Sequence, residues 1–189
     1  MLQTRQMVLI AILSALSFSL MLFGFPIIPG ADFLKVELSI LPILLGLYLF
    51  DLKTAYLILG LRTILKFVLN NRGVNDWIGL PMNVLALAIF VACFALIWKT
   101  KETVSRYVMA SLVGTVVLTL SMLLLNWVYG IPLYAKLANF DISQFIGTSL
   151  YLFGMVLPFN LVQGLIFSLS FALIYRLLKP ILSTYRYEK

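Results

Sequence analysis

The chain has 189 residues, of which 62% are hydrophobic and only 11% are charged. About a quarter of the residues in a water-soluble domain are charged, so this composition excludes an ordinary soluble domain. The formal net charge of +7 does not indicate nucleic-acid binding, because the basic residues stand beside apolar segments, as they do at the ends of membrane helices. We therefore expect an all-α, multi-pass protein of the cell membrane, with residues 1–189 forming a single transmembrane domain.

Six apolar segments predict a six-transmembrane-helix bundle, since about 20 apolar residues cross a hydrocarbon core of about 30 Å. The first segment follows Arg5 without an A-x-A-like cleavage site and is expected to be a retained helix rather than a signal peptide. The last apolar run is too long for one crossing, and Gly154 and Pro158 predict a break in it, preceded by an outer, partly embedded segment. The predicted spans are Met7–Phe25, Val36–Phe50, Thr54–Leu69, Trp77–Trp98, Tyr107–Val128 and Met155–Leu178.

The distribution of Lys and Arg predicts the orientation of these spans. Cytoplasmic flanks of membrane helices are enriched in basic residues. An arrangement with both termini in the cytoplasm places nine basic residues inside and three outside, while Arg62 and Lys66 fall within the third span. The inner residues are Arg5, Lys53, Lys99, Lys101, Arg106, Arg176, Lys179, Arg186 and Lys189, and the outer ones are Lys35, Arg72 and Lys136.

Polar side chains gather near the outer ends of the predicted spans. Asn83, Asn126, Asn160 and Gln163 come from three different spans. A carboxamide without a partner in hydrocarbon is unfavourable by several kcal/mol, so each must pair with protein groups, water or a ligand. Hydrogen bonding between helices is one interpretation. Because the four lie at a similar depth and the outer loops are the longer ones, we favour a ligand pocket that opens to the outside.

The third span carries Arg62, Lys66 and Asn70 four residues apart, on one helical face. A charge within the membrane usually faces the bundle interior or a watery cavity. For Arg62 we expect a structural ion pair or a polar interior, whereas Lys66 could extend to the interface or face the pocket. Candidate acidic partners are Asp32, Glu37, Asp76 and Asp141.

Small residues recur on the first span at Ala11, Ala15 and Ser19. Such a stripe lets another helix approach closely. It could pack within the chain or form a groove for a partner subunit, and the spacing does not distinguish the two.

The residues for several kinds of chemistry are missing. The chain has no histidine and one cysteine, Cys93, which excludes Ser-His catalysis and H-E-x-x-H zinc sites. It contains neither a Walker A motif nor G-x-G-x-x-G. We therefore expect no enzymatic activity, no metal and no bound cofactor.

The segment Asp32–Pro42, with the sequence DFLKVELSILP, resembles the F-L-K-[VI]-[DE]-x-S-x-x-P pattern of riboflavin-type substrate-binding subunits, or S components, of energy-coupling factor (ECF) transporters. The A-x-x-x-A spacing of Ala11 and Ala15 is similar to the motif by which S components dock on their transmembrane partner. Length, six spans and the outer carboxamides agree with this family.

The resemblance implies a subunit of a bacterial plasma membrane that captures riboflavin from outside and delivers it with a transmembrane coupling subunit and two ATP-binding cassette ATPases. Riboflavin would be the transported ligand and not a cofactor. The expected ligand-binding residues are Asp32, Lys35, Glu37, Asn75, Asn83, Asn126, Asn160 and Gln163.

Three alternatives stay open. An S component for another vitamin or a purine-like compound would keep the fold and change the ligand. An intramembrane enzyme would need a nucleophile and base that the sequence does not offer. A stand-alone transporter or channel would move substrate without ATPase partners.

Overall fold

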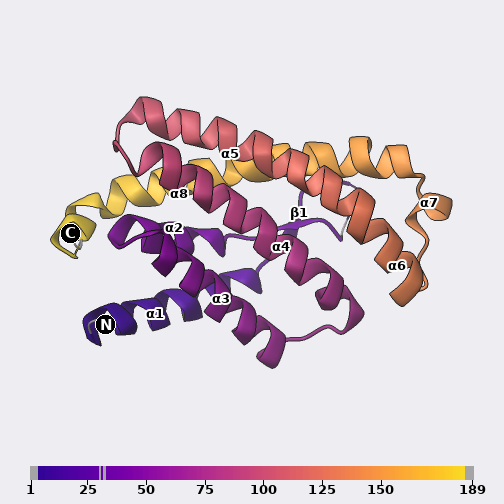
Figure 1. The fold of residues 1–189 in the computed structure, drawn as a ribbon, viewed down its shortest axis with the longest axis horizontal. Helices are drawn as coiled ribbons and strands as arrows, with labels where there is room; N and C mark the ends of the chain where they lie inside the picture. Colours follow the sequence, from indigo (N-terminus) through magenta and orange to yellow (C-terminus); the bar gives the residue numbers. More distant parts are fainter. Residues whose placement is uncertain (1–3, 30, 32, 186–189) are drawn as a thin grey trace.

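The computed structural model of the protein describes residues 4–29, 31 and 33–185. It is mostly helical, with long helices packed along one another and one small hairpin (Figure 1). The α-helices and strands are α1 (Thr4–Met21), β1 (Phe25–Pro26), β2 (Lys35–Val36), α2 (Ile40–Leu49), α3 (Leu52–Leu69), α4 (Val74–Cys93), α5 (Val104–Leu125), α6 (Ile131–Leu137), α7 (Ile142–Phe145) and α8 (Leu157–Tyr185), and π-helical turns occupy Phe94–Trp98, Asn126–Gly130 and Leu150–Val156.

Four helical stretches in the described part of the chain are long and apolar enough to cross a membrane. Helix α3 has 18 residues but carries three basic side chains. Helix α2 has 10 residues, which corresponds to about 15 Å at 1.5 Å per residue, shorter than a hydrocarbon core. The four stretches are Thr4–Met21, Val74–Trp98, Val104–Leu137 and Leu150–Pro180.

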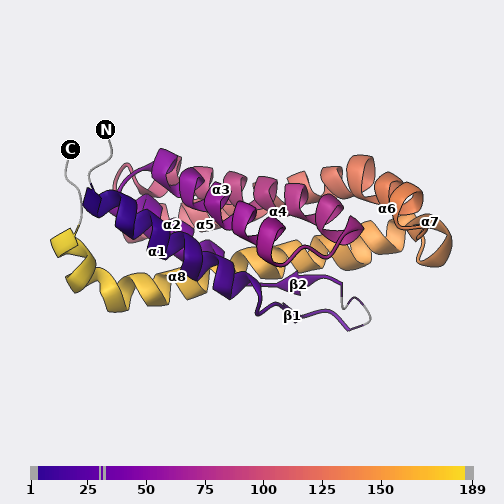
Figure 2. The same ribbon diagram turned by 90° about the horizontal axis from the view of Figure 1, so that it is seen from below.

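Helix α1 begins, and helix α8 ends, at the same end of the bundle, which we call the terminal end (Figure 1). Helices α6 and α7 lie at the opposite end, called here the loop end. Figure 2 shows the β1–β2 hairpin running beside α8 toward the loop end. The helical stretch that contains α8 runs from the loop end to the terminal end.

The first two predicted spans are longer than the helices that form. Phe25 and Val36, the expected end and start of spans, instead pair with each other across the antiparallel β1–β2 hairpin. Pro26 in β1 has no backbone N–H and cannot continue a helix, but a proline is tolerated in an edge strand. The hairpin thus replaces about one helical turn on either side of the first outer connection.

The predicted break at Gly154 and Pro158 is wrong, because a continuous helical stretch runs from Leu150 to Pro180. A proline ring normally clashes with the carbonyl four residues earlier, which here belongs to Gly154. The π-helical turn widens the backbone at this point, and the Leu157 N–H bonds to the Leu152 carbonyl. This register lets the helix continue past Pro158.

A second proline, Pro81, lies inside α4. It cannot donate a hydrogen bond to the carbonyl of Trp77, one turn earlier. That carbonyl instead accepts a hydrogen bond of 3.4 Å from the Tyr129 hydroxyl on the second π turn. The proline therefore frees a backbone acceptor that ties α4 to the loop end.

The core toward the terminal end is aromatic. Trp98 is almost fully buried, and its ring lies edge-on to Tyr175 at a centroid distance of 5.1 Å. Such edge-to-face pairs add about 0.5–1.5 kcal/mol beyond area burial. The other rings of the cluster are Tyr48, Phe90, Phe94, Tyr107, Phe167 and Phe171.

Helices α5 and α8 are in close contact at Gly164. A Cβ atom added there would lie 2.4 Å from the Thr115 hydroxyl oxygen, so only glycine permits this contact. Small residues are the usual means by which membrane helices pack closely. The contact fixes the helix that carries Asn160 and Gln163 against the helix that leads to Asn126.

Candidate functional site

A buried ionic network joins the hairpin to α3 and α4. The Arg62 guanidinium, fully buried, lies 3.9 Å from the Glu37 carboxylate. Arg62 also donates a 2.9 Å hydrogen bond to the Asn83 carbonyl oxygen, and the Asn83 amide donates to Glu37 at 3.3 Å. The structural ion pair expected for Arg62 is thus present, and it includes two predicted ligand-binding residues, Glu37 and Asn83.

Helix α1 and the start of α2 complete this network. The other Glu37 carboxylate oxygen accepts a 2.7 Å hydrogen bond from the Ser39 backbone N–H, and the Ser39 carbonyl accepts one of 2.6 Å from the Ser17 hydroxyl. Arg62 contacts the Met21 sulfur at 2.8 Å. A buried charge requires such a set of partners, so α1, α2, α3 and α4 are linked through a single guanidinium.

Lys66, one turn beyond Arg62, forms a second ion pair near the end of α3. Its ammonium lies 2.6 Å from the Asp76 carboxylate and 3.0 Å from the Asn70 side-chain oxygen, and it also contacts the Asn70 carbonyl. Asp76 accepts a further 2.7 Å hydrogen bond from the Arg72 backbone N–H. Lys66 therefore links the two ends of the α3–α4 connection. Its acidic partner is Asp76, one of the four candidates.

Asn126 stands at the first residue of the second π turn and is 4% exposed. Its amide nitrogen donates to the Met122 carbonyl at 2.8 Å, and its oxygen accepts a 2.6 Å hydrogen bond from the Tyr151 hydroxyl. Tyr151 belongs to the third π turn, so the pair joins the two helical stretches that converge at the loop end. The Tyr151 ring also lies 6.1 Å from the ring of Phe33, on the connection between β1 and β2.

Asn160 and Gln163 lie one turn apart on α8, and both are buried. The Asn160 amide nitrogen donates to the Val156 carbonyl at 2.7 Å, while its buried oxygen has no hydrogen-bond partner among the residues that the structure describes. An unpaired buried acceptor is unfavourable by about 1–3 kcal/mol. Such an atom is a natural contact for an N–H group of a ligand.

The remaining predicted ligand-binding residues differ in position. Lys35 on β2 and Asn75 at the start of α4 are exposed, and their side chains make none of the hydrogen bonds found among the described residues. Asp32 lies outside the described residues. The structure therefore brings Glu37 and Asn83 together in one network, and it places Asn126 and Asn160 beside a separate apolar cluster at the loop end, whose members are Ile131, Ile142, Tyr151, Leu152 and Val156.

The small-residue stripe of α1 lies on the outer surface of the bundle. Ala11, Ala15 and Ser19 are all exposed, whereas the buried residues of α1 are Ile10, Leu13, Ser14 and Ser17. Packing of the stripe within the chain, one of the two interpretations, is therefore wrong.

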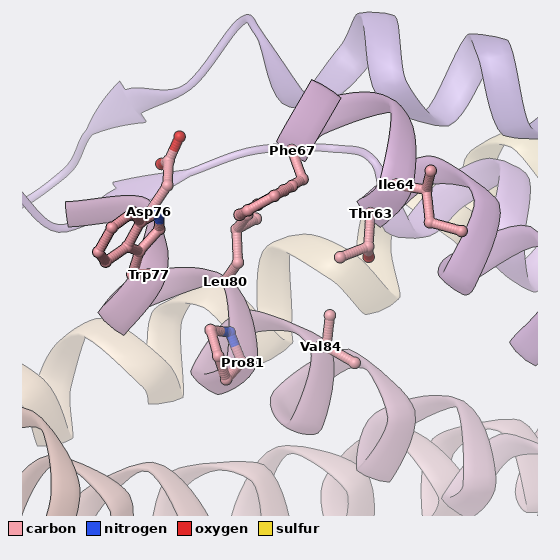
Figure 3. Close-up of a pocket in the computed structure, with 8 residues that line it drawn as sticks. All are labelled: Thr63, Ile64, Phe67, Asp76, Trp77, Leu80, Pro81 and Val84. Atoms are coloured by element: carbon pink, nitrogen blue, oxygen red, sulfur yellow. The ribbon is translucent and has the colours of Figure 1, made fainter. Parts of the chain in front are cut away.

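Two apolar grooves lie outside the carboxamide positions. The first, about 540 Å³, runs between α3 and α4 and has Trp77, Leu80 and Phe67 in its wall, with Asp76 among its lining residues (Figure 3). The second, about 470 Å³, lies between Trp127 and Phe153. Neither groove is lined by any of the predicted ligand-binding residues that the structure describes.

Several side chains that contact the predicted residues were not predicted from the sequence. Ser39, Ser17 and Met21 belong to the Arg62 network, and Tyr151 contacts Asn126. Each stands in an apolar context where aromatic, small or sulfur-containing side chains are common. The serine in the F-L-K-[VI]-[DE]-x-S pattern was a usable signal for Ser39, because it follows Glu37 by two residues. For Tyr151 only the structure supplies a reason.

Comparisons with known proteins agree with this architecture. A family described as the substrate-specific component of ECF transporters matches residues 5–175. This chain belongs to that family. An S component therefore carries the buried Arg62 network and the carboxamides described above, and groups of three or more side chains suited to a metal are absent from its described residues.

Three relatives and one solved structure extend the comparison. Riboflavin transporter RibU of Streptococcus thermophilus is 56% identical to this S component over 96% of the chain and 86% of its own length. Proteins of the same name from Leuconostoc mesenteroides and Lactococcus lactis are 42% and 40% identical over 95% and 94% of the chain, covering 93% and 94% of their own lengths. The S component of a bacterial ECF transporter superposes with a TM-score of 0.79 at 26% identity, covering 96% of this chain and 99% of that one.

Removing Arg62 is expected to destabilise the fold strongly. Arg62→Met leaves the buried Glu37 carboxylate without its cation, and breaking a buried ion pair in this way lowers stability by about 3–5 kcal/mol. The double variant Arg62→Met/Glu37→Gln removes both charges and should recover part of that loss. Thermal unfolding in detergent measures the effect.

The matched control is Arg72→Met, because Arg72 is exposed and its described hydrogen bond uses the backbone. This control should unfold at the wild-type temperature. An Arg62→Met protein as stable as Arg72→Met would contradict a stabilising role for the network.

Proposed function

We propose that this S component captures riboflavin at the outer side of the membrane and delivers it together with a separate ATP-driven module. The observation that carries the proposal is the 56% identity, over 96% of the chain, to a protein named riboflavin transporter. The names of the other two relatives support the same ligand.

The chemistry of the ligand is compatible with the buried carboxamides. An isoalloxazine ring has a flat apolar face and an edge with carbonyl and N–H groups. Burying about 200 Å² of aromatic surface at about 25 cal/mol per Å² contributes about 5 kcal/mol. Nanomolar binding requires about 12 kcal/mol, so hydrogen bonds to the edge and the polar chain must supply much of the rest.

Asn126 and Asn160 offer complementary hydrogen-bonding groups for such an edge. Asn160 has an unpaired acceptor oxygen, suited to a ring N–H. Asn126 uses one of its two amide N–H groups within the protein, and the second suits a ring carbonyl. We assign these two residues and Gln163 to the ring edge or the ribityl chain.

The other candidate residues take supporting places in this proposal. Asn83 donates a hydrogen bond to Glu37, a residue of the loop that we assign to the ligand, and we therefore place Asn83 close to the ligand. Asp32, Lys35 and Glu37 belong to the first outer loop, which covers the ligand, and Asn75 is a weaker candidate at the α3–α4 side of the mouth. Both Glu37 carboxylate oxygens already accept hydrogen bonds from protein groups, which favours a structural role in which this residue holds the loop in place.

Riboflavin binding is tested with the purified protein. Binding should quench flavin fluorescence with one-to-one stoichiometry. Asn160→Ala should weaken the affinity about 5- to 150-fold, which corresponds to the 1–3 kcal/mol of a buried unpaired partner.

Asn71→Ala serves as the control, since Asn71 is exposed on the α3–α4 connection and should leave the affinity unchanged. Protein that fails to quench added riboflavin would exclude this ligand, and displacement by purines or other vitamins would then identify another. Unchanged affinity in Asn160→Ala would remove that residue from the site.

We further propose that the bundle crosses the plasma membrane six times with both termini in the cytoplasm. The excess of basic residues beside the predicted inner ends supports this orientation, as does the position of the start of α1 and the end of α8 at one end of the bundle. Helix α2 then crosses together with the segment that precedes it. The carboxamides and the hairpin face outward.

Cysteine labelling in cells tests this topology. In a Cys93→Ser background, a cysteine at exposed Lys35 should react with a membrane-impermeant maleimide in intact cells. A cysteine at exposed Lys101 should react only after permeabilisation. The reverse pattern would contradict the proposed orientation.

The exposed stripe at Ala11 and Ala15 is proposed to dock on the transmembrane coupling subunit of the ECF module, which also contains two ATP-binding cassette ATPases. Its exposure supports this interpretation, since a face of small residues lets a partner helix approach closely. Riboflavin capture, by contrast, depends on the loop end.

Bulky side chains on the stripe should separate these two activities. Ala11→Leu/Ala15→Leu should abolish co-purification with the coupling subunit and leave riboflavin affinity within twofold of wild type. Gly60→Leu is the matched control, because Gly60 is exposed on α3 and a Cβ atom there meets nothing within 4 Å. Normal co-purification of the double variant would contradict the docking proposal.

A further inference from the structure

The Tyr151 hydroxyl makes a hydrogen bond that the packing of the aromatic ring does not require. Its side chain is 2% exposed, yet its hydroxyl reaches the Asn126 carboxamide across two helical stretches at 2.6 Å. A phenylalanine at this position would keep the apolar contacts with Leu152 and Val156 and would remove the hydrogen bond alone. The hydroxyl therefore acts on Asn126.

This hydrogen bond determines which way the Asn126 amide points. The Met122 carbonyl can accept only from the amide nitrogen, and the Tyr151 hydroxyl donates to the amide oxygen. A flipped amide would place its oxygen against the Met122 carbonyl oxygen. With both contacts made, the remaining N–H of Asn126 has one direction, and donation by the hydroxyl polarises the amide so that this N–H becomes a stronger donor.

The ring of Tyr151 also meets the β1–β2 connection. The Phe33 and Tyr151 rings lie 6.1 Å apart at an interplanar angle of 30°, within the range of attractive aromatic pairs. Phe33 is otherwise 56% exposed, so Tyr151 is a specific contact for it. A substitution at Phe33 can therefore affect the Asn126 carboxamide through the Tyr151 side chain.

We propose that Tyr151 is a positioning residue for ligand capture: it holds the Asn126 carboxamide with its free N–H toward a carbonyl acceptor on the ligand, and it couples that carboxamide to Phe33. This inference rests on riboflavin being the ligand. It assigns Tyr151 an effect on binding that passes entirely through Asn126.

A double-mutant cycle tests the coupling, because residues that act through one contact are not additive. Riboflavin affinity and dissociation rate are measured by fluorescence for wild type, Tyr151→Phe, Asn126→Ala and the double variant. Tyr151→Phe should weaken affinity at least fivefold, mainly through faster dissociation. The double variant should match Asn126→Ala within twofold.

Tyr107→Phe is the matched control. It also removes a 2.6 Å hydrogen bond from a tyrosine hydroxyl, in this case to the Ser168 carbonyl, but it lies in the aromatic core toward the terminal end. Its riboflavin affinity should equal that of wild type even if its melting temperature falls as far as that of Tyr151→Phe. An equal loss of affinity in both variants would overturn the proposal, since general destabilisation would then explain it.

Phe33→Ala provides a second test that does not depend on how well Tyr151→Phe folds, because Phe33 is largely exposed. It should speed riboflavin dissociation at least threefold in the wild-type background and by less than 1.5-fold in Asn126→Ala. Additive effects in either cycle, or wild-type affinity in Tyr151→Phe, overturn this inference alone. A wild-type protein that does not bind riboflavin overturns the proposed function and this inference together.

Discussion

The positive charge of Arg62, buried within an apolar bundle, is the constraint on which the arrangement of the first four helices depends. Burying a charge is strongly unfavourable unless partners surround it. Those partners come from three separate places, namely Met21 on α1, Glu37 just before α2, and Asn83 on α4, while Arg62 itself lies on α3. Each contact is weak evidence of stability by itself, but together they specify one relative placement of these elements. An apolar residue could fill the same volume without specifying that placement.

Much of this organisation could be predicted from composition and spacing. The apolar runs gave the positions of the long helices because lipid-facing stretches need about 20 residues, and the depth of Arg62 indicated a buried ion pair. The hairpin could not be predicted, since Phe25 and Val36 are as apolar as any helix residue and their strands are two residues long. The continuous helix at Pro158 was missed because a π turn depends on backbone register rather than on residue type.

The candidate site could likewise be predicted only in part. The carboxamides were found because polar groups are rare within apolar runs. Their partners were not, since Tyr151 and Met122 look like core residues in the sequence, and only the fold brings Tyr151 to Asn126. The sequence also suggested one cluster of four carboxamides, whereas Asn83 belongs to the Arg62 network and Asn126 is hydrogen-bonded to Tyr151 of a separate apolar cluster. Similar depth in the membrane does not establish contact.

Three of the four long helical stretches contain a π-helical turn. Such a turn includes one residue more than an α-helical turn, so side chains beyond it are rotated by about 100° relative to an uninterrupted helix. In the stretch Val104–Leu137 the π turn lies between α5 and α6, so these two helices present their inward-facing residues in different phases, whereas the other two π turns lie at one end of their stretch. The wall that α6 contributes at the loop end can therefore be varied by substitution without changing the face that α5 packs against α8.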